Sequence, residues 1–600
     1  MFGDFEIREM PLSLSSVREK VGKFLLSQDL RMEPLDRYFG IFDSADKLVG
    51  GGGIEGNVIK CIALSEATRN ESLTNPLVSR IRESAMTDGH PEVFLFTKPK
   101  NRIIFESLAF HTIGESEKAI LLESNPRGVT SYCQTLRKTR DSLPHTDKQK
   151  NGVIVMNCNP MTSGHLFLIE TAATQVDRLF IIPVMEGKPE YDYIERKEMI
   201  EKGTDHLSNV SVVSGSPYSV SQATFPTYFL KDLSDASRTH IELDLDIFAR
   251  HIAPALDVSV RFIGSEPTDA LTREYNAMMH QMLPARGIEV IEIFRLEKDA
   301  CPVSASRVRR LTQSMQAGAA IQLLPPTSIP YLLSHLASMC LREELDLTPK
   351  PGLVDLNDTG AHTDMDHSLM NRSITSLQPW FREICEIASR YPSHEETSLA
   401  ASGIKEAGIA AENAMLKTTN GINTHRGALF SIGITLAATM RLHKRTCPIG
   451  EESLQKEIQE LAFFFPGGEK TNGAQAKTKF GIKGAAETAK EGYRQLYSDW
   501  LPFWRQVKSD ADGKLKLLLR IMTTLDDTNI YYRGGIQGSL FVKETAERIL
   551  RDFSLSALQR ANVEFIGLNL SPGGAADMLA LTLLTHSLIP QMDNSYRNNK

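Results

Sequence analysis

The sequence predicts a multidomain chain with an α+β domain first, an α/β domain with a mostly parallel sheet second, and an all-α domain last. The chain has 600 residues, too many for one hydrophobic core, and about 150 residues per domain gives three or four domains. Short apolar, β-branched runs alternate with helical patterns in the first half, which is typical of βαβ units. Segments rich in Ala, Leu and Gly dominate the second half and favour helices packed through small residues.

Strands are expected where apolar runs are short and rich in β-branched residues. In the N-terminal domain these runs are 39–43, 47–54, 58–64 and 93–97. In the middle domain they are 152–157, 178–184, 210–215, 260–264 and 288–294. The longest helical patterns of the last domain are 398–416, 427–443 and 576–589.

Two segments, 137–150 and 318–329, divide the chain. The first lacks apolar periodicity, and the second contains Pro325 and Pro326, which stop a helix. We therefore expect domains at 1–136, 151–317 and 330–600, joined by linkers at 137–150 and 318–329.

Charge and cysteine usage exclude several classes of protein. The chain has 67 Lys+Arg against 74 Asp+Glu, a formal charge of −7, and no long basic run, which argues against nucleic-acid and anionic-membrane binding. Its seven cysteines form no CxxC pair, which fits a reducing compartment. The first residues are charged, and no apolar stretch approaches about 20 residues. We expect a cytoplasmic protein with no nucleic acid and no membrane as partner.

The sharpest motif of the middle domain is Thr162-x-Gly164-His165, which follows an apolar strand and a turn containing Asn159. At a strand-to-helix junction, backbone N–H groups and the positive helix end favour phosphate oxygens. Gly164 permits close approach of a phosphate, and His165 can donate a hydrogen bond to a phosphoryl group. The alternative is an ordinary capped helix with a packed histidine.

A second Ser-rich helix start follows the last predicted strand of this domain. Ser304, Ser306 and Arg307 place hydroxyls and a guanidinium at this helix start, which makes a second phosphate clamp. The alternative is a helix cap with a solvated basic face.

The two motifs, in this order, resemble the T/H-x-G-H and I-S-x-S-R/K signatures of the nucleotidyltransferase superfamily. With residues 221–231 and 264–267 they resemble citrate lyase ligase over about residues 1–317. The resemblance implies a Rossmann-like domain of the HxGH type. It also implies that acetate and ATP form acetyl-adenylate, and that the acetyl group passes to the thiol of the citrate lyase acyl carrier protein.

This family implies roles for the motif residues. His165 and Thr162 would be catalytic, with Asn159, Gly164, Ser304, Ser306 and Arg307 binding ATP and Mg²⁺ on the phosphates. It also implies an N-terminal GNAT-like domain. The corresponding pyrophosphate loop, residues 67–81, has Arg69 but no glycine, so we expect a carrier-docking or structural role there instead of CoA binding.

Four polar islands interrupt the apolar sequence of the last domain, within 348–370, 413–430, 525–535 and 569–579. Such breaks between helices are where an all-α protein can gather ligand groups. Carboxylates suit Mg²⁺, and Lys or Arg suits its phosphates. The islands hold Lys350, Asp355, His362, Asp364, Asp366, His367, Asn423, His425, Arg426, Asp526, Asp527, Arg533 and Asp577.

Each island also has a structural interpretation. Residues 362–367 look like a transition-metal cluster, but the pattern favours a surface loop rich in helix caps. Asp526 and Asp527 are adjacent, so they point in different directions, and one can be a helix cap.

Together the islands resemble triphosphoribosyl-dephospho-CoA synthases from about residue 330 onward. That family joins ATP, through C1′ of its ribose, to the 2′-hydroxyl of dephospho-CoA and expels adenine. The resemblance implies Asp526 and Asp527 as metal ligands, and Asp355 or Asp364 as the base on the hydroxyl. His425 would be catalytic. The phosphate contacts would be Lys350, Arg426 and Arg533.

The sequence thus predicts a bifunctional maturation enzyme of citrate lyase, an acid–thiol ligase joined to a triphosphoribosyltransferase. Its substrates and partners would be ATP, acetate, dephospho-CoA and the acyl carrier protein, with Mg²⁺ as cofactor. Two alternatives remain: an adenylyltransferase for a phosphopantetheine- or nicotinate-like substrate fused to a synthase, or a scaffold with one inactive site.

Overall fold

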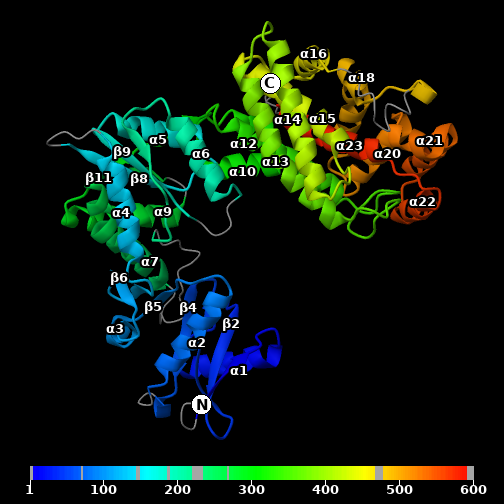
Figure 1. The fold of residues 1–600 in the computed structure, drawn as a ribbon. Coiled ribbons are helices and arrows are strands. Elements are labelled where there is room, and N and C mark those ends of the chain that lie inside the picture. Colours follow the sequence, from blue (N-terminus) through cyan, green and yellow to red (C-terminus); the bar gives the residue numbers. More distant parts are fainter. Residues whose placement is uncertain are drawn as a thin grey trace, which may run out of the picture. The chain divides into compact units, whose positions relative to one another are not determined.

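A computed structural model describes residues 5–68, 72–143, 149–185, 190–218, 234–266, 269–465 and 478–590. The chain divides into two compact units, Met1–Pro302 and Val303–Lys600, coloured blue to green and green to red in Figure 1. The domain boundaries expected from sequence, including the one at residue 317, remain predictions. Arg69 and residues 221–231 lie outside the described residues.

The first unit begins with a mixed seven-stranded sheet in the order β1-β2-β3-β4-β5-β7-β6. Only β4 and β5 pair in parallel, through two residue pairs, and the other neighbours are antiparallel. This confirms mixed α and β structure in the N-terminal region, and the GNAT likeness stays a prediction. The elements are β1 (Glu6–Met10), α1 (Ser15–Ser27), β2 (Arg37–Phe42), β3 (Leu48–Glu55), β4 (Val58–Leu64), α2 (Thr74–Thr87), β5 (Phe94–Thr97), α3 (Arg102–Glu106), β6 (His111–Glu115), β7 (Ile120–Glu123) and α4 (Gly128–Asp141).

The second sheet of this unit has five parallel strands in the order β10-β9-β8-β11-β12, as the alternation of strand and helix patterns predicts. After β8 the chain forms β9 and β10 on one side of β8, and it then crosses to the other side of β8 to form β11 and β12. A sheet that reverses in this way has a crevice at the carboxyl ends of the two central strands. The elements are β8 (Asn151–Met156), α5 (Ser163–Ala173), β9 (Arg178–Pro183), α6 (Tyr193–Thr204), β10 (Val210–Val212), α7 (Ser234–Ile247), α8 (Ala253–Leu256), β11 (Val258–Gly264), α9 (Ala270–Met282) and β12 (Glu289–Ile293).

The two sheets of the first unit share one apolar core. Phe94 of the mixed sheet and Phe180 of the parallel sheet belong to the same buried cluster. The Tyr218 hydroxyl donates to Glu123 Oε2 at 2.7 Å across this core, so the junction between the sheets is also fixed by a buried polar contact.

The described part of the second unit is helical, which confirms the all-α prediction. Helices α15 and α23 are apolar on nearly every side and lie buried among the others, as expected for central helices. No helix among the described residues is both long and apolar enough to cross a bilayer. The helices are α10 (Ala305–Gln313), α11 (Ala317–Ile321), α12 (Ile329–Leu345), α13 (His367–Arg390), α14 (Thr397–Thr418), α15 (Arg426–Lys444), α16 (Glu451–Ala462), α18 (Ala485–Lys490), α19 (Leu501–Val507), α20 (Gly513–Thr524), α21 (Thr528–Arg551), α22 (Leu555–Gly567) and α23 (Gly573–Leu588).

Candidate active sites of the two units

The Thr162-x-Gly164-His165 motif forms the start of α5, directly after β8. Thr162 is the N-cap, and its Oγ1 accepts the backbone N–H of His165 at 3.3 Å. His165 Nδ1 in turn accepts the backbone N–H of Thr162 at 3.0 Å. Each residue therefore satisfies an amide of the other, which is the reciprocal arrangement of a capping box.

This pairing fixes the tautomer of His165. A ring nitrogen that accepts an N–H bond carries no proton, so the proton of the neutral ring is on Nε2. Burial, and then the positive charge of Arg295, lower the pKa of His165 to about 4. His165 is therefore a neutral hydrogen-bond donor at physiological pH.

The turn between β8 and α5 is held by a fully buried guanidinium. Arg196 of α6 donates to Asn157 O at 2.9 Å and to Val184 O at 2.8 Å. Asn159 Oδ1 accepts the backbone N–H of Tyr191 at 3.1 Å. Asn159 is thus part of the support of this turn.

The carboxyl ends of β11 and β12 contribute further charged groups. The Arg295 guanidinium forms an ion pair with Glu266, and the backbone N–H of Arg295 donates to Ser265 Oγ at 3.1 Å. Because Arg295 lowers the pKa of His165, this cation lies close enough to act on the ring electrostatically. This edge of the sheet therefore carries an ion-paired arginine near His165.

The second predicted phosphate clamp belongs to the other unit. Ser304 is the N-cap of α10 and accepts the backbone N–H of Arg307 at 3.2 Å. Ser306 Oγ accepts from Arg309 Nη2 at 3.3 Å. The expected helix start is present, and the ATP-binding role of Ser304, Ser306 and Arg307 remains a prediction.

The second unit contains a pocket of about 1540 Å³. Its walls include parts of all four polar islands, which lie far apart in the sequence. Six predicted site residues line it: Asp364, His425, Arg426, Asp526, Asp527 and Arg533.

One wall of the pocket is acidic. Asp527 is the N-cap of α21, is 6% exposed, and accepts backbone N–H groups of Asn529 at 2.9 Å and Ala575 at 3.0 Å. Burial raises its pKa to about 6. Burial, followed by the charges of Glu344 and Asp527, raises the pKa of Asp577 well above its usual value. The charges of Glu344 and Asp527 therefore lie close enough to disfavour the charged form of Asp577.

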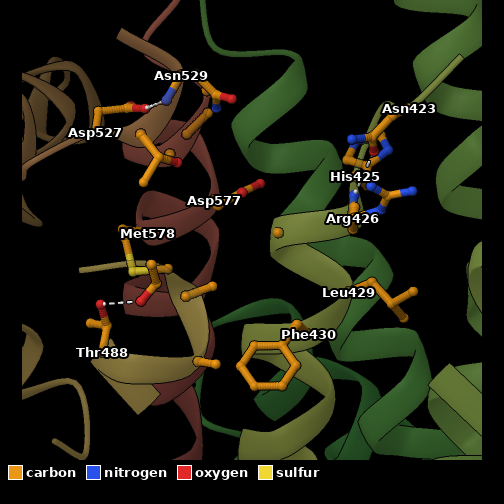
Figure 2. Close-up of a pocket in the computed structure, with 18 of the residues that line it drawn as sticks. Asn423, His425, Arg426, Leu429, Phe430, Thr488, Asp527, Asn529, Asp577 and Met578 are labelled. Carbon is orange, nitrogen blue, oxygen red and sulfur yellow. Dashed lines mark hydrogen bonds between the residues drawn. The ribbon is translucent and has the colours of Figure 1, made fainter. Parts of the chain in front are cut away.

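The facing wall begins at the N-terminus of α15 and carries His425 and Arg426. Figure 2 shows His425 and Arg426 on this wall and Asp577 on the facing one. His425 is 3% exposed, its Nδ1 lies 3.0 Å from Ser373 Oγ, and its Nε2 has no hydrogen-bond partner among the described residues. Burial, and then the charge of Lys350, lower its pKa to about 4. The Arg426 guanidinium pairs with Glu412.

The first island reaches the same pocket through His362. Its Nε2 lies 2.8 Å from Ser571 Oγ, and its Nδ1 lies 3.4 Å from Arg533 Nη2 and 3.6 Å from Asp364 Oδ1. Arg533 also donates to Ala361 O at 2.9 Å. These contacts connect the loop around His362 to α21 and to the segment that precedes α23.

Two predicted site residues support this loop without lining the pocket. Lys350 is 1% exposed, and its ammonium lies 2.5 Å from Glu344 Oε1. Asp355 is 2% exposed and accepts backbone N–H groups of Lys350 at 2.9 Å and Asn357 at 2.7 Å. The structure therefore places Lys350 behind the acidic wall and Asp355 inside the turn, and does not bring either to the cavity.

The remaining island residues follow the structural interpretation. Asp366 is the N-cap of α13, and His367 Nε2 lies 2.6 Å from Asp346 Oδ1. As expected for adjacent residues, Asp526 and Asp527 diverge, because Asp526 pairs with Lys543 at 2.6 Å and is exposed.

No group of metal-ligating side chains within 4.8 Å of one another includes Asp526 or Asp527 in the described part of the chain. The group found there is His394, Glu457 and Glu460. Glu457 is already paired with Arg441 at 2.6 Å.

Comparison with known proteins identifies both units. Residues 151–332 match the model of the citrate lyase ligase C-terminal domain, and residues 330–595 match that of ATP:dephospho-CoA triphosphoribosyl transferase. A [citrate [pro-3S]-lyase] ligase of Klebsiella pneumoniae is 39% identical over 321 residues, 53% of this chain and 92% of that protein. One from Escherichia coli strain K12 is 35% identical over 56% of this chain and 96% of that protein.

A probable 2-(5''-triphosphoribosyl)-3'-dephosphocoenzyme-A synthase of Salmonella gallinarum is 35% identical over 286 residues, 43% of this chain and 93% of that protein. The chain is a fusion of these two families. Both resemblances seen in the sequence are thereby confirmed, and the two families follow one another along the chain in the order that the motifs predict.

Sequence reasoning missed several charged groups in this citrate lyase ligase–synthase fusion. In the ligase unit these are Arg196 and Arg295, which no short motif marks. In the synthase unit Glu344 and Glu412 lie within ordinary amphipathic helices, so only the fold brings them to the pocket. Asp577 lies in the last polar island, and this position in the sequence was the feature that could have marked it as a site residue.

Proposed function

We propose that the chain performs two steps in the maturation of citrate lyase. The ligase unit would acetylate the prosthetic-group thiol of the acyl carrier protein through acetyl-AMP. The synthase unit would make 2′-(5″-triphosphoribosyl)-3′-dephospho-CoA from ATP and dephospho-CoA. The observation that carries the proposal is the convergence of all four synthase islands on one pocket.

In the ligase step an acetate oxygen attacks the α-phosphorus of ATP, and the bond to pyrophosphate breaks. His165 Nε2–H would donate a hydrogen bond to a phosphoryl oxygen as negative charge develops, since its Nδ1 is engaged by the Thr162 amide. Thr162 and Gly164 would orient the phosphate at the start of α5, and the ATP-binding role of Ser304, Ser306 and Arg307 stays a prediction from the sequence. Acetate is already an anion, so no protein base is required.

In the synthase step the bond between C1′ and adenine breaks, and adenine leaves with the bonding electron pair and takes up a proton from water. The 2′-hydroxyl oxygen of dephospho-CoA bonds to C1′. Asp364 would accept the hydroxyl proton, because it lines the pocket while Asp355 does not. Arg426 and Arg533 would contact the triphosphate. His425 Nε2, buried without a partner among the described residues, would donate to a phosphate oxygen.

The acidic wall fits a divalent cation. Asp527 and Asp577 are buried carboxylates that line one pocket, and burial is the main cause that raises their pKa values. Carboxylate oxygens are the ligands that Mg²⁺ prefers. These two residues would hold Mg²⁺, and Asp526 would stay at the rim. When bound, the ion would neutralise charge on the triphosphate.

The test of the ligase proposal is pyrophosphate release from ATP. We expect release to require acetate, and we expect His165→Ala to lower the rate about 100- to 1000-fold, as losing one such donor does. The matched control is adenine release by the same variant, which should persist. Release triggered by a phosphorylated acceptor and not by acetate would instead indicate an adenylyltransferase. Full acetylation of the carrier by His165→Ala would indicate a scaffold.

A further inference from the structure

The synthase pocket continues from its charged walls into a groove between α14 and α15. On α15 the lining residues are Arg426, Gly427, Leu429, Phe430, Gly433 and Ile434. This spacing puts them on one face of the helix. The face runs about 12 Å from Arg426 to Ile434, at 1.5 Å per residue, and is apolar beyond its first residue. Figure 2 shows Leu429 and Phe430 following Arg426 along this wall.

The α14 wall is likewise charged at the end near Arg426 and mostly apolar beyond it. On α14 the lining residues are Ile404, Lys405, Gly408, Ile409 and Glu412, again on one helix face. Glu412 pairs with Arg426, so the charged ends of the two faces meet. Because the two faces start from this ion pair, the apolar residues of α14 and α15 lie along the same groove.

Two glycines, Gly408 and Gly433, lie on the walls of the groove. A Cβ placed on Gly408 would meet no atom within 4 Å, so the space beside it is open. A Cβ on Gly433 would lie 3.1 Å from Ile384 Cδ1, so the space beside Gly433 is already occupied by another lining residue. Gly408 is therefore the position where an added side chain would enter the groove instead of the core.

We propose that this α14–α15 groove binds the pantetheine arm of dephospho-CoA, an inference that rests on the synthase function proposed above. The arm is a narrow chain of methylenes, methyls and amides attached to a diphosphate. It therefore matches a groove that holds the Arg426–Glu412 pair at one end and mostly apolar residues, with Lys405 among them, beyond it. The triphosphate does not match, because the groove offers only Lys405 as a cation beyond Arg426. The volume also fits, since about 1540 Å³ exceeds the roughly 300–1,000 Å³ of a site for one drug-sized ligand.

The test fills the groove. Gly408→Leu places an apolar side chain in the open space and replaces a poor helix former with a good one. We expect the KM for dephospho-CoA to rise about tenfold or more and the KM for ATP to stay within about twofold, with adenine release as the readout. Ser402→Leu is the matched control, because Ser402 is an exposed residue of α14 that does not line the pocket, and it should change neither KM.

Each outcome decides the question. An unchanged KM for dephospho-CoA, a rise confined to ATP, or an equal rise for both substrates would overturn the inference. An absence of adenine release from the unsubstituted chain would refute the synthase function itself, which is a different result.

Discussion

His165 owes its chemistry to a local hydrogen-bond exchange. The Thr162 amide occupies Nδ1, and burial with the Arg295 charge holds the pKa of the ring near 4. A histidine with this pKa is neutral from about pH 5 upward. It can therefore donate a hydrogen bond without acting as an acid–base group.

The ligase pH profile tests this assignment. We expect kcat/KM for acetate to show no acid limb from His165 near pH 6.5, because its folded-state pKa lies well below its ordinary value. The measurement is the pH–rate profile of the unsubstituted chain and of His165→Gln. An inflection near pH 6.5 that disappears in the variant would show that His165 titrates during turnover.

Asp526 and Asp527 provide a matched pair of neighbours. Asp527 is buried on the acidic wall and holds the starts of α21 and α23, while Asp526 is exposed and paired with Lys543. We expect Asp527→Asn to lower adenine release about 100-fold or more, and Asp526→Asn to lower it less than about threefold. Raising Mg²⁺ should restore part of the activity of the first variant, because the loss of one ligand weakens binding of the ion. Equal losses in the two variants would contradict the proposed division of roles.

At the scale of helices, the synthase site depends on the close approach of α15 and α23. A Cβ on Gly427 would overlap the Asp577 Oδ2 atom, so only glycine lets this carboxylate reach the start of α15. We expect Gly427→Ala to reduce adenine release about tenfold or more and to leave acetate-dependent pyrophosphate release unchanged.

The control for this substitution is Gly567→Ala at the end of α22. A Cβ there would meet no atom within 4 Å, so both activities should stay as they are. Full synthase activity in Gly427→Ala would mean that the contact between Asp577 and α15 has no part in the reaction.

Sequence reasoning succeeded where local pattern determines structure. The apolar run before Thr162 became β8, the motif itself became the start of α5, and the Ala-rich segments became α14 and α15. It could not see that Lys350 would pair with Glu344, because these residues are joined by a turn whose path the surrounding packing fixes. The same limit applies to Arg196, whose partners lie on other elements of the sheet edge.

At the scale of the whole molecule, the chain joins two families in two compact units. One unit would make the precursor of the prosthetic group, and the other would acetylate the thiol of the mature group on its carrier. Because the residues proposed for each reaction are distinct, His165→Ala and Asp527→Asn should each strongly reduce one activity and spare the other.

The most direct measurement is incubation of the purified chain with ATP, Mg²⁺ and dephospho-CoA, with free adenine followed by chromatography and mass spectrometry. We predict that adenine appears only when dephospho-CoA is present, together with a product that carries the triphosphoribosyl group. If a folded chain that still releases pyrophosphate with acetate gives no adenine, the account of the synthase unit is wrong.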